Sequence, residues 1–308
     1  MSAPEYAIGV DIGGTKIAFA LVDRSGQALD THQLATNAGS GPDAVIEAAA
    51  EGVRLLAGRS PGRVAGVGVG VPGFVDFEWG IVRNAVNLGW VEMPLAARLA
   101  EATGLPTRVQ NDVNALLDGE LRFGAARGCR AVALAAIGTG VGGAFAFEGK
   151  VVSGAVGSAG EIGHTPIMPS RRLCRCGLRG CVEAYLSGVG LASGVSEHRA
   201  DFPASPLAQG EPAAREIVAA ADAGDKLALA IMAEALEAWQ MVVAVYAMIL
   251  NPERIVIGGG LGSALAPRLL EAGQQALQEQ VLPFARGLTF ALAEVQSPAV
   301  GAAAAAFA

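Results

Sequence analysis

The sequence predicts an α/β protein made of two related halves. At 308 residues the chain is long enough for two domains. Segments with strand patterns alternate with segments with helical patterns, which is typical of the α/β class. A strand, a glycine turn and a second strand occupy residues 7–22, and the same order returns at residues 131–150. We interpret this recurrence as an internal duplication in which each half begins with the same hairpin.

The other expected elements follow from hydrophobic periodicity and from glycine and proline. In the first hairpin Ile17, Phe19 and Leu21 alternate with alanines, so the alanine face should let another element pack closely. The predicted helices are residues 42–57, 92–103, about 224–250 and 300–308, and the predicted strands are residues 64–71, 105–110 and 254–257. The expected irregular parts are a glycine-rich segment at 151–183, an exposed loop at 200–214 and a turn at 258–260.

Composition and charge exclude several classes of protein. Hydrophobic residues make up 52% of the chain and charged residues 17%, which excludes a disordered protein. The formal net charge of −7 gives no electrostatic footprint for nucleic acid or for an anionic membrane. The N-terminus lacks a basic stretch followed by an apolar one. The longest apolar run, residues 241–250, is too short to span a bilayer and reads as a buried helix ending at Asn251-Pro252. We therefore expect a cytoplasmic protein that binds neither nucleic acid nor membrane.

The two glycine turns carry groups suited to phosphate. Amides left bare by glycine can cradle phosphate oxygens, and a neighbouring hydroxyl and amine can add donors. Asp11 is suited to orient a magnesium ion or its waters. The alternative is that glycine only accepts a positive φ at a tight turn. The candidate phosphate-binding residues are Asp11, Gly13, Gly14, Thr15, Lys16, Gly138, Thr139, Gly140, Gly142 and Gly143.

Two G-x-G-x-x-G matches, at residues 68–73 and 138–143, are weak. A dinucleotide-binding turn must open a helix, and neither of these segments is followed by a helical pattern. The sequence also lacks a G-x-x-x-x-G-K-[ST] loop and the protein-kinase signatures.

Asp112 is the candidate catalytic base. It follows a predicted strand directly, at a place where catalytic groups are often displayed. An ionised aspartate there can accept the proton of a hydroxyl group. Asp112 fits a helix N-cap equally well, because the helical run Val113-Asn114-Ala115 follows it. The residues alone leave both interpretations open.

A cysteine cluster and one histidine predict a zinc site. Cys174, Cys176 and Cys181 fall within eight residues. In a cytosolic chain such a cluster indicates metal ligation more often than disulfide formation. With His164 they match a tetrahedral Cys₃His site, which is structural because all four positions are filled by the protein.

The segment before His164 should form a tightly turning loop. Glycine stands at positions 154, 157, 160 and 163, so this loop delivers Glu161 and His164 to one place. We expect the zinc to hold the loop so that Glu161 and Glu183 face a substrate.

Taken together, these motifs resemble those of the ROK sugar kinases over nearly the whole chain. The motifs are VDIGGTK (10–16), VGVPG (69–73), NLGW (87–90), QNDVNALLDGE (110–120), GTGVGG (138–143), GEIGH (160–164), CRCGLRGCVE (174–183) and IVIGGGLG (255–262). The resemblance implies a two-domain, actin-like (ribonuclease-H-like) fold with an interdomain cleft. The smaller domain would be residues 1–110 completed by the C-terminal helix 295–308. The larger domain, residues 111–294, would contain the zinc loop.

The resemblance also implies ATP-dependent phosphorylation of a hexose. Asp112 would take the proton from the 6-hydroxyl of the sugar, and the two glycine turns would hold the phosphates of ATP with Mg²⁺. Gly259, in the segment 258–260, would lie by the adenosine. The residues implied to bind the sugar hydroxyls are Asn111, Glu161, His164 and Glu183, with His164 also a zinc ligand.

The pattern looks most similar to the glucokinases of this family, so glucose is the expected sugar and glucose 6-phosphate the product. Kinases for fructose, mannose or amino and N-acetylated hexosamines share the motifs and stay as alternatives. A sugar-sensing regulator without activity is a further alternative, but regulators of this family carry a helix-turn-helix before the phosphate turn, which here begins by residue 11. An actin-like filament subunit would explain the hairpins but not the cysteines. We expect a homodimer or a homotetramer.

Three positions depart from the family pattern. Gln110 stands where many relatives carry glutamate, and Arg175 stands where many have glycine. The segment 297–300 lacks the acidic residue often found before the last helix. The choice between ATP and polyphosphate as phosphoryl donor stays open.

Overall fold

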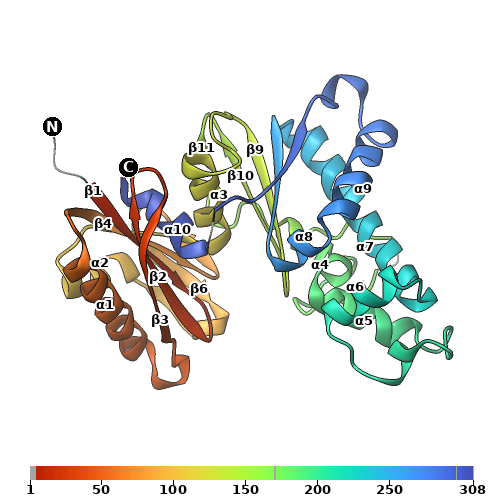
Figure 1. The fold of residues 1–308 in the computed structure, drawn as a ribbon, viewed down its shortest axis with the longest axis horizontal. Helices are drawn as coiled ribbons and strands as arrows, with labels where there is room; N and C mark the ends of the chain where they lie inside the picture. Colours follow the sequence, from red (N-terminus) through yellow and green to blue (C-terminus); the bar gives the residue numbers. More distant parts are fainter. Residues whose placement is uncertain (1–4, 170, 296, 308) are drawn as a thin grey trace. The chain divides into compact units, whose positions relative to one another are not determined.

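A computed structural model describes residues 5–169, 171–295 and 297–307, which form two compact units (Figure 1). Unit 1 contains the described residues of Met1–Arg130, Ala144–Ala159 and Glu294–Ala308. Unit 2 contains the described residues of Ala131–Gly143 and Gly160–Ala293. Compared with the expected boundary after residue 110, unit 1 extends to Arg130. Helix α3 (Asp112–Phe123) packs against strand β4 (Arg63–Val71) and helix α10 (Pro298–Ala303) of that unit.

Unit 1 is built on a five-stranded sheet that contains the first predicted hairpin. Its strand order is β3-β2-β1-β4-β8, in which β1 pairs antiparallel with β2 and parallel with β4, and β4 pairs parallel with β8. Asp11 lies opposite Gly70, and Gly70 lies opposite Gln110, so the carboxyl ends of the three parallel strands share one edge. The strands are β1 (Glu5–Ile12), β2 (Lys16–Asp23), β3 (Ala28–Ala35), β4 (Arg63–Val71) and β8 (Thr107–Asn111).

The larger side chains of this sheet face helices α1 (Pro42–Arg59) and α2 (Leu95–Thr103). Ile17, Phe19 and Leu21 belong to the core that these helices complete. Alternation along β1 and β2 places the large side chains on this face and the small ones on the other. The predicted helix at 42–57 and the predicted strand at 64–71 are both present.

The face with small residues lies against helix α10 (Pro298–Ala303) and the 3₁₀ turn η7 (Ala304–Phe307). A Cβ atom at Gly9 would lie 1.7 Å from the carbonyl oxygen of Ala299, and a Cβ at Gly68 would lie 1.8 Å from that of Ala302. The predicted close packing against small residues is therefore confirmed. Ser297 begins α10 by accepting a 3.3 Å hydrogen bond from Val300 N–H. Of the predicted tail 300–308, Ala308 lies outside the described residues.

A second, three-stranded sheet in unit 1 was not expected from the sequence. It contains β5 (Phe74–Asp76), β6 (Ile81–Ala85) and β7 (Trp90–Met93). The expected helix at 92–103 is wrong in its first residues, because Met93 pairs with Val82 of β6 and α2 begins at Leu95, after Pro94. A proline disfavours helical backbone in the residue before it, which explains the late start.

The other predicted hairpin opens the second five-stranded sheet, which has the order β11-β10-β9-β12-β13. Strand β12 pairs parallel with β9 and with β13. The boundary between the units falls within β10. The strands are β9 (Val132–Ile137), β10 (Val141–Phe147), β11 (Lys150–Val151), β12 (Arg254–Gly258) and β13 (Thr289–Leu292).

The helices of unit 2 follow the irregular segment that the glycine pattern predicted. They are α4 (Glu183–Leu186), α5 (Gly188–His198), α6 (Ala214–Asp222), α7 (Lys226–Val245), α8 (Gly260–Ala264) and α9 (Ala266–Glu279). Short 3₁₀ turns are η1 (Ala38–Ser40), η2 (Val86–Leu88), η3 (Ile162–His164), η4 (Pro206–Gln209) and η6 (Pro283–Ala285). Two expectations are corrected. The loop at 200–214 buries Ser205 and Ala208 around η4, and the turn at 258–260 ends where Gly260 begins α8.

Helix α7 continues into the π-helical turn η5 (Tyr246–Leu250). Within the described part of the chain, this is the one helix that is long and apolar enough to cross a membrane by length and composition. Helix α7 packs against α4, α5, α6 and α9. Trp239 is fully buried, and its indole N–H donates a 2.7 Å hydrogen bond to the carbonyl of Leu269. These are the contacts of a core helix, and it ends before Asn251, as expected.

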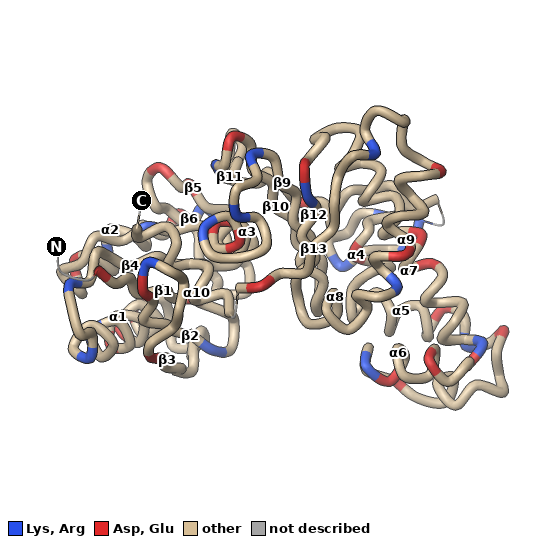
Figure 2. Tube along the Cα trace, turned by 45° about the horizontal axis from the view of Figure 1, so that its top comes forward, with Lys and Arg blue, Asp and Glu red and all other residues tan. Residues whose placement is uncertain are grey.

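Figure 2 shows acidic and basic residues scattered singly or in pairs along the trace of both units. Several of them form ion pairs at the surface of their own unit, such as Arg98 with Asp43 and Arg268 with Asp222. Exposed pairs of this kind contribute little to stability.

Candidate active site

The first glycine turn presents bare backbone at the end of β1. Gly13 N–H donates a 2.9 Å hydrogen bond to the carbonyl of Lys16, and the buried Thr36 hydroxyl donates a 2.6 Å bond to the carbonyl of Gly13. Gly14, Thr15 and Lys16 are exposed. Neither glycine has a positive φ, and a Cβ at Gly14 would meet its nearest atom only at 3.8 Å. The turn conformation therefore does not require glycine at position 14, whereas close approach of a ligand to the backbone would.

Asn111, not Asp112, caps helix α3. The Asn111 side-chain oxygen accepts hydrogen bonds from Val113 N–H at 2.9 Å and from Asn114 N–H at 3.2 Å. Its amide nitrogen donates a 3.1 Å bond to the carbonyl of Gly73. The interpretation of Asp112 as the N-cap is thus wrong, because Asp112 is the first residue inside the helix. The cap bonds also give Asn111 a structural role besides the sugar-binding role that the resemblance implies.

Two carboxylates, Asp11 and Asp112, share an electrostatic environment in unit 1. Burial raises the pKa of Asp11 to about 6, the negative charge of Asp112 adds to this increase, and Lys16 opposes it. Burial also raises the pKa of Asp112, while a hydrogen bond from the backbone of Val113 opposes that shift. A carboxylate kept from water beside another carboxylate is costly in the charged form and is typical of functional sites.

The second glycine turn, between β9 and β10, is held by Glu183. The Glu183 carboxylate accepts a 2.9 Å hydrogen bond from Val141 N–H. A Cβ at Gly140 would lie 2.4 Å from this carboxylate, so a larger residue there would displace the Glu183 side chain. A Cβ at Gly138 would meet no atom within 4 Å, and neither Gly138 nor Gly140 has a positive φ. Gly138 therefore leaves open space above bare backbone, as Gly14 does in the first turn.

The segment that carries Glu161 and His164 lies directly on β10. A Cβ at Gly163 would come within 2.0 Å of the carbonyl oxygen of Val141, so only glycine permits this approach. Glu161 is exposed and precedes the 3₁₀ turn η3, and His164 ends that turn. The structure thus places Glu161, His164 and Glu183 around the start of β10, in the same unit.

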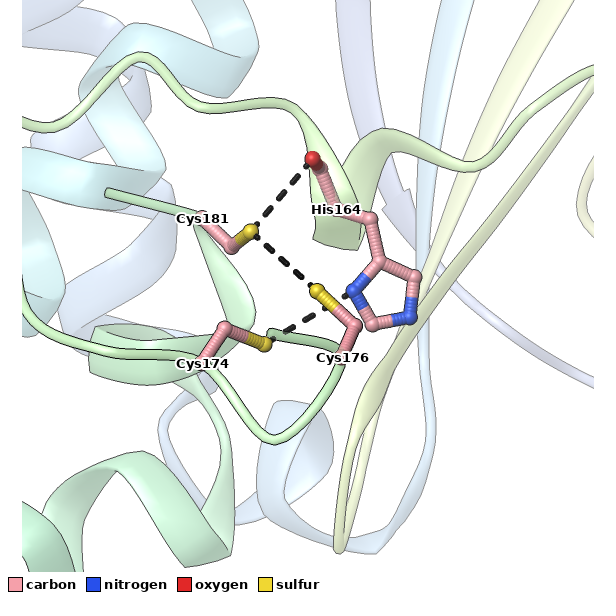
Figure 3. A group of neighbouring side chains, drawn as sticks. All are labelled: His164, Cys174, Cys176 and Cys181. Atoms are coloured by element: carbon pink, nitrogen blue, oxygen red, sulfur yellow. Dashed lines mark hydrogen bonds between the residues drawn. The ribbon is translucent and has the colours of Figure 1, made fainter. Parts of the chain in front are cut away.

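His164 and the three clustered cysteines form one group of possible metal ligands (Figure 3). One ligand atom from each residue lies within 4.8 Å of the others. The Sγ atoms of Cys176 and Cys181 are 3.7 Å apart, and Cys174 Sγ lies 3.8 Å from His164 Nδ1. These sulfurs are too far apart for a disulfide, whose S–S bond is about 2.05 Å.

The distances within this group fit a tetrahedral zinc ion. Bonds of about 2.3 Å to sulfur and about 2.0–2.1 Å to nitrogen place two sulfurs about 3.8 Å apart, and a sulfur and a nitrogen about 3.5 Å apart. Burial raises the pKa of Cys181 to about 12, so that thiol would keep its proton without a metal ion. Glu183 lies next to the group, with a carboxylate oxygen 3.9 Å from Cys174 Sγ. Glu183 therefore contacts both this group and the second glycine turn.

Two charged residues that support the site were not identified from the sequence. Arg172, two residues before Cys174, is buried, pairs with Glu197 and Glu234, and stacks over the Tyr185 ring. It braces the cysteine loop against α5 and α7. Its acidic partners lie 25 and 62 residues away, so no local spacing could have revealed the network.

Glu120, at the end of α3, is fully buried. Its carboxylate accepts hydrogen bonds from Ala125 N–H at 2.7 Å, Glu294 N–H at 2.9 Å and Val295 N–H at 2.8 Å. Burial raises the pKa of Glu120, and these bonds oppose the shift. Glu120 thereby fixes the segment in which the chain returns from unit 2 to unit 1.

Gly259 has a conformational reason to be glycine. Its φ is +82°, and a Cβ there would lie 2.3 Å from the carbonyl oxygen of Ile137. The next residues, Gly260 and Leu261, line a cavity of about 420 Å³ together with one side of α6. Backbone conformation and close packing are therefore sufficient to explain the glycine at position 259. The adjacent cavity offers space for a ligand.

The fold and these residues define a class: a two-unit α/β protein with two glycine turns, a partly buried aspartate at the start of a helix and a Cys₃His group. A family model described as "ROK family" matches residues 7–308. The chain belongs to the ROK family.

Three comparisons give the relatives of this chain. It is 36% identical over 304 residues to a glucokinase of Halalkalibacterium halodurans, covering 96% of this chain and 92% of the relative. A ROK hexokinase structure from Thermus thermophilus is 30% identical, with a TM-score of 0.83 and coverage of 98% of each chain. The ROK glucokinase of Streptomyces griseus, solved with glucose and AMPPNP, is 30% identical with a TM-score of 0.78, covering 97% of this chain and 98% of that one. These matches confirm the predicted two-domain actin-like fold class.

Proposed function

We propose that this chain transfers the γ-phosphoryl group of ATP to the 6-hydroxyl of a hexose, with glucose as the preferred sugar. The glucokinase relative and the glucose and AMPPNP complex of the Streptomyces griseus enzyme support the choice of both substrates. The partly buried carboxylate of Asp112, which does not cap the helix, is the observation that carries the proposal in this chain.

Asp112 acts as the general base. A bond forms between the 6-oxygen of the sugar and the γ-phosphorus, the bond from that phosphorus to the β-phosphate oxygen breaks, and the hydroxyl proton passes to Asp112. Because burial raises the pKa of Asp112, its carboxylate holds this proton better than an exposed aspartate would. Asn111 holds the start of α3 through its cap bonds, so it keeps Asp112 in place.

The first glycine turn binds phosphate through bare amides, with Thr15 and Lys16 as further donors. Magnesium, when bound, neutralises phosphate charge, as in other phosphoryl transfers. Asp11 is the residue that would orient this ion or its waters. In unit 2 the amides near Gly138 provide a second phosphate contact, and the cavity beside Gly260 offers space for the adenosine.

Glu161, His164 and Glu183 bind sugar hydroxyls in this proposal. His164, Cys174, Cys176 and Cys181 hold a structural zinc ion, which fixes the loop that carries Glu161. The packing of Gly163 on Val141 and the contact of Glu183 with Cys174 support this coupling. A homodimer or homotetramer in the cytoplasm completes the proposal and stays a prediction.

Replacing Asp112 by asparagine tests the proposal. The amide keeps the shape of the side chain but cannot accept the proton, so kcat should fall by about 10²–10⁴-fold while glucose binding persists. Asp118→Asn is a matched control, because Asp118 lies on the same helix and its pKa is also raised by burial. Near-normal turnover in Asp112→Asn would refute the assignment, as would an equal loss in Asp118→Asn.

Product analysis tests the sugar and its orientation. Phosphorus NMR should show glucose 6-phosphate, and a 1-phosphate would contradict the proposed arrangement. Deletion of one hydroxyl leaves buried polar groups unpaired, at a cost on the order of 1–3 kcal/mol. 2-Deoxyglucose should therefore be a poorer substrate than glucose. Much faster turnover of an N-acetylated hexosamine would keep the hexose-kinase assignment but overturn the preference for glucose.

A further inference from the structure

A second cavity of unit 2, of about 500 Å³, lies beside the glycine turn at 138–140. One wall is a face of helix α5, and Thr139 of the turn forms part of another. The remaining lining comes from the cysteine loop and from the segment before α6. The lining residues are Thr139, Arg175, Gly188, Val189, Ala192, Ser193, Ser196, Glu211, Pro212 and Ala214.

Arg175 is the cation of this cavity. It is exposed, and it makes no hydrogen bond or ion pair with any residue that the structure describes. Arg172, three residues earlier, has the opposite character, because it is buried and paired with two glutamates. Arg175 stands between Cys174 and Cys176, so the same loop that forms the metal group fixes its backbone. A guanidinium offers a planar fork of N–H donors that matches phosphate oxygens.

The start of α5 does not compete for this role. Gly188 N–H donates to the carbonyl of Gly138 at 2.9 Å, and Val189 N–H donates to that of Thr139 at 3.3 Å. Gly190 N–H donates to the Ser187 hydroxyl at 2.9 Å. The first amides of the helix are therefore engaged, and they hold the helix against the glycine turn. The helix amides therefore cannot bind a phosphate in the cavity, whereas the side chain of Arg175 offers cationic donors that no described residue occupies.

Glu211 is the opposite charge in the same cavity. It forms no ion pair with Arg175 or with any other cation among the described residues. Two unpaired charges of opposite sign at separate positions suit a ligand that is anionic at one end and carries hydroxyls at the other. A carboxylate accepts hydrogen bonds from ribose hydroxyls, as in dinucleotide-binding proteins. The same carboxylate repels a chain of phosphates, which lacks hydroxyl donors.

We infer that Arg175 binds a phosphate of the donor nucleotide and that Glu211 binds a hydroxyl of its ribose. The cavity thereby selects a nucleoside triphosphate over inorganic polyphosphate. This inference rests on the proposed function, because it places the phosphoryl donor at the turn 138–140.

Nucleotide binding to the zinc-loaded protein tests Arg175 directly. Titration calorimetry with ADP and magnesium should show affinity reduced about tenfold or more in Arg175→Ala, since a charge-assisted hydrogen bond is lost. The Michaelis constant for ATP should rise in parallel, while that for glucose and the zinc content stay unchanged. Arg179→Ala is the matched control, because Arg179 is an exposed arginine of the same loop outside this cavity. Wild-type ADP affinity in Arg175→Ala, or an equal loss in Arg179→Ala, would overturn the inference.

Glu211→Gln tests the selection against polyphosphate. Tripolyphosphate should displace ADP from this variant at several-fold lower concentration than from the wild type, and ADP should bind several-fold more weakly. Glu237→Gln, an exposed glutamate of α7, should change neither value. Unchanged competition in Glu211→Gln would refute the role of Glu211. If the wild type binds ADP as described but phosphorylates no hexose, the proposed function fails while the binding comparison still decides on Arg175.

Discussion

Asparagine at position 11 should make the protein more stable and less active. Burial and the charge of Asp112 raise the pKa of Asp11 from 3.8 to about 6. A shift of about 2 units, at 1.36 kcal/mol per unit, corresponds to about 3 kcal/mol. The charged carboxylate therefore destabilises the folded state by about that amount relative to the neutral group. Asp11→Asn removes the charge and should raise the free energy of unfolding by about 2–3 kcal/mol at pH 8.

The sign of the pH dependence follows from the raised pKa. Above pH 6 Asp11 is charged in both the folded and the unfolded state, so the buried charge destabilises the folded protein by its full amount. As the pH falls from about 6 toward 4, the folded protein takes up the proton first and the cost disappears. The stability difference between Asp11→Asn and the wild type should therefore shrink across this range and vanish below about pH 4.

Urea unfolding between pH 4 and pH 8 measures this difference. With Trp79 and Trp239 replaced by phenylalanine in both proteins, the fluorescence of Trp90, which is buried in unit 1, reports the unfolding of that unit. Asp30→Asn is a control of opposite sign, because a hydrogen bond from Arg59 lowers the pKa of Asp30. At pH 8 Asp30→Asn should be less stable than the wild type. The reasoning is refuted if Asp11→Asn is as stable as the wild type or less stable at this pH.

Three further substitutions test the supports of the site. Elemental analysis should find one zinc ion per chain in the wild type and less zinc in Cys176→Ser, which should also lose stability and sugar affinity. Cys129→Ser is the control and should keep the zinc content of the wild type. Asn111→Ala should lower the free energy of unfolding by about 1–2 kcal/mol through loss of the cap, and Asn111→Asp should recover much of it, as measured by chemical denaturation. In Glu120→Gln one carboxylate oxygen is replaced by an NH₂ group, which cannot accept hydrogen bonds from the backbone N–H groups. The free energy of unfolding should fall by an amount on the order of 1–3 kcal/mol in the same assay. Wild-type stability in Glu120→Gln would show that these bonds do not hold the returning segment.

Local patterns predicted the two hairpins, because strand alternation and glycine turns are encoded within a few residues. The Cys₃His group was predicted for the same reason, since three of its members lie within eight residues. Strand β3 alternates in burial along its whole length but contains polar residues such as Asp30 and Gln33, so its hydrophobic signal is weak. The short strands β5 to β7 have 3–5 residues each and depend on pairing with one another.

The roles of Asn111 and Asp112 show where the sequence was insufficient. Both residues have good cap side chains, and only the position at which the helix begins assigns the cap to Asn111. The site roles of Asp112 and of the glycine turns stay predictions until the variants above are measured. Arg172 and Glu120 were missed because their partners are distant in sequence, and a buried charge gives no signal without them.

The close packing of α10 on Gly9 and Gly68 also orders events during synthesis. Strands β1 and β4 leave the ribosome early, whereas the helix that covers their face is translated after the whole of unit 2. At about 5–20 residues per second, more than ten seconds pass before α10 appears. During that time most of unit 2 is translated, while unit 1 still presents an open face made largely of alanine and glycine. Small residues expose little apolar area, so this uncovered face of the sheet should bind a chaperone or a neighbouring nascent chain only weakly.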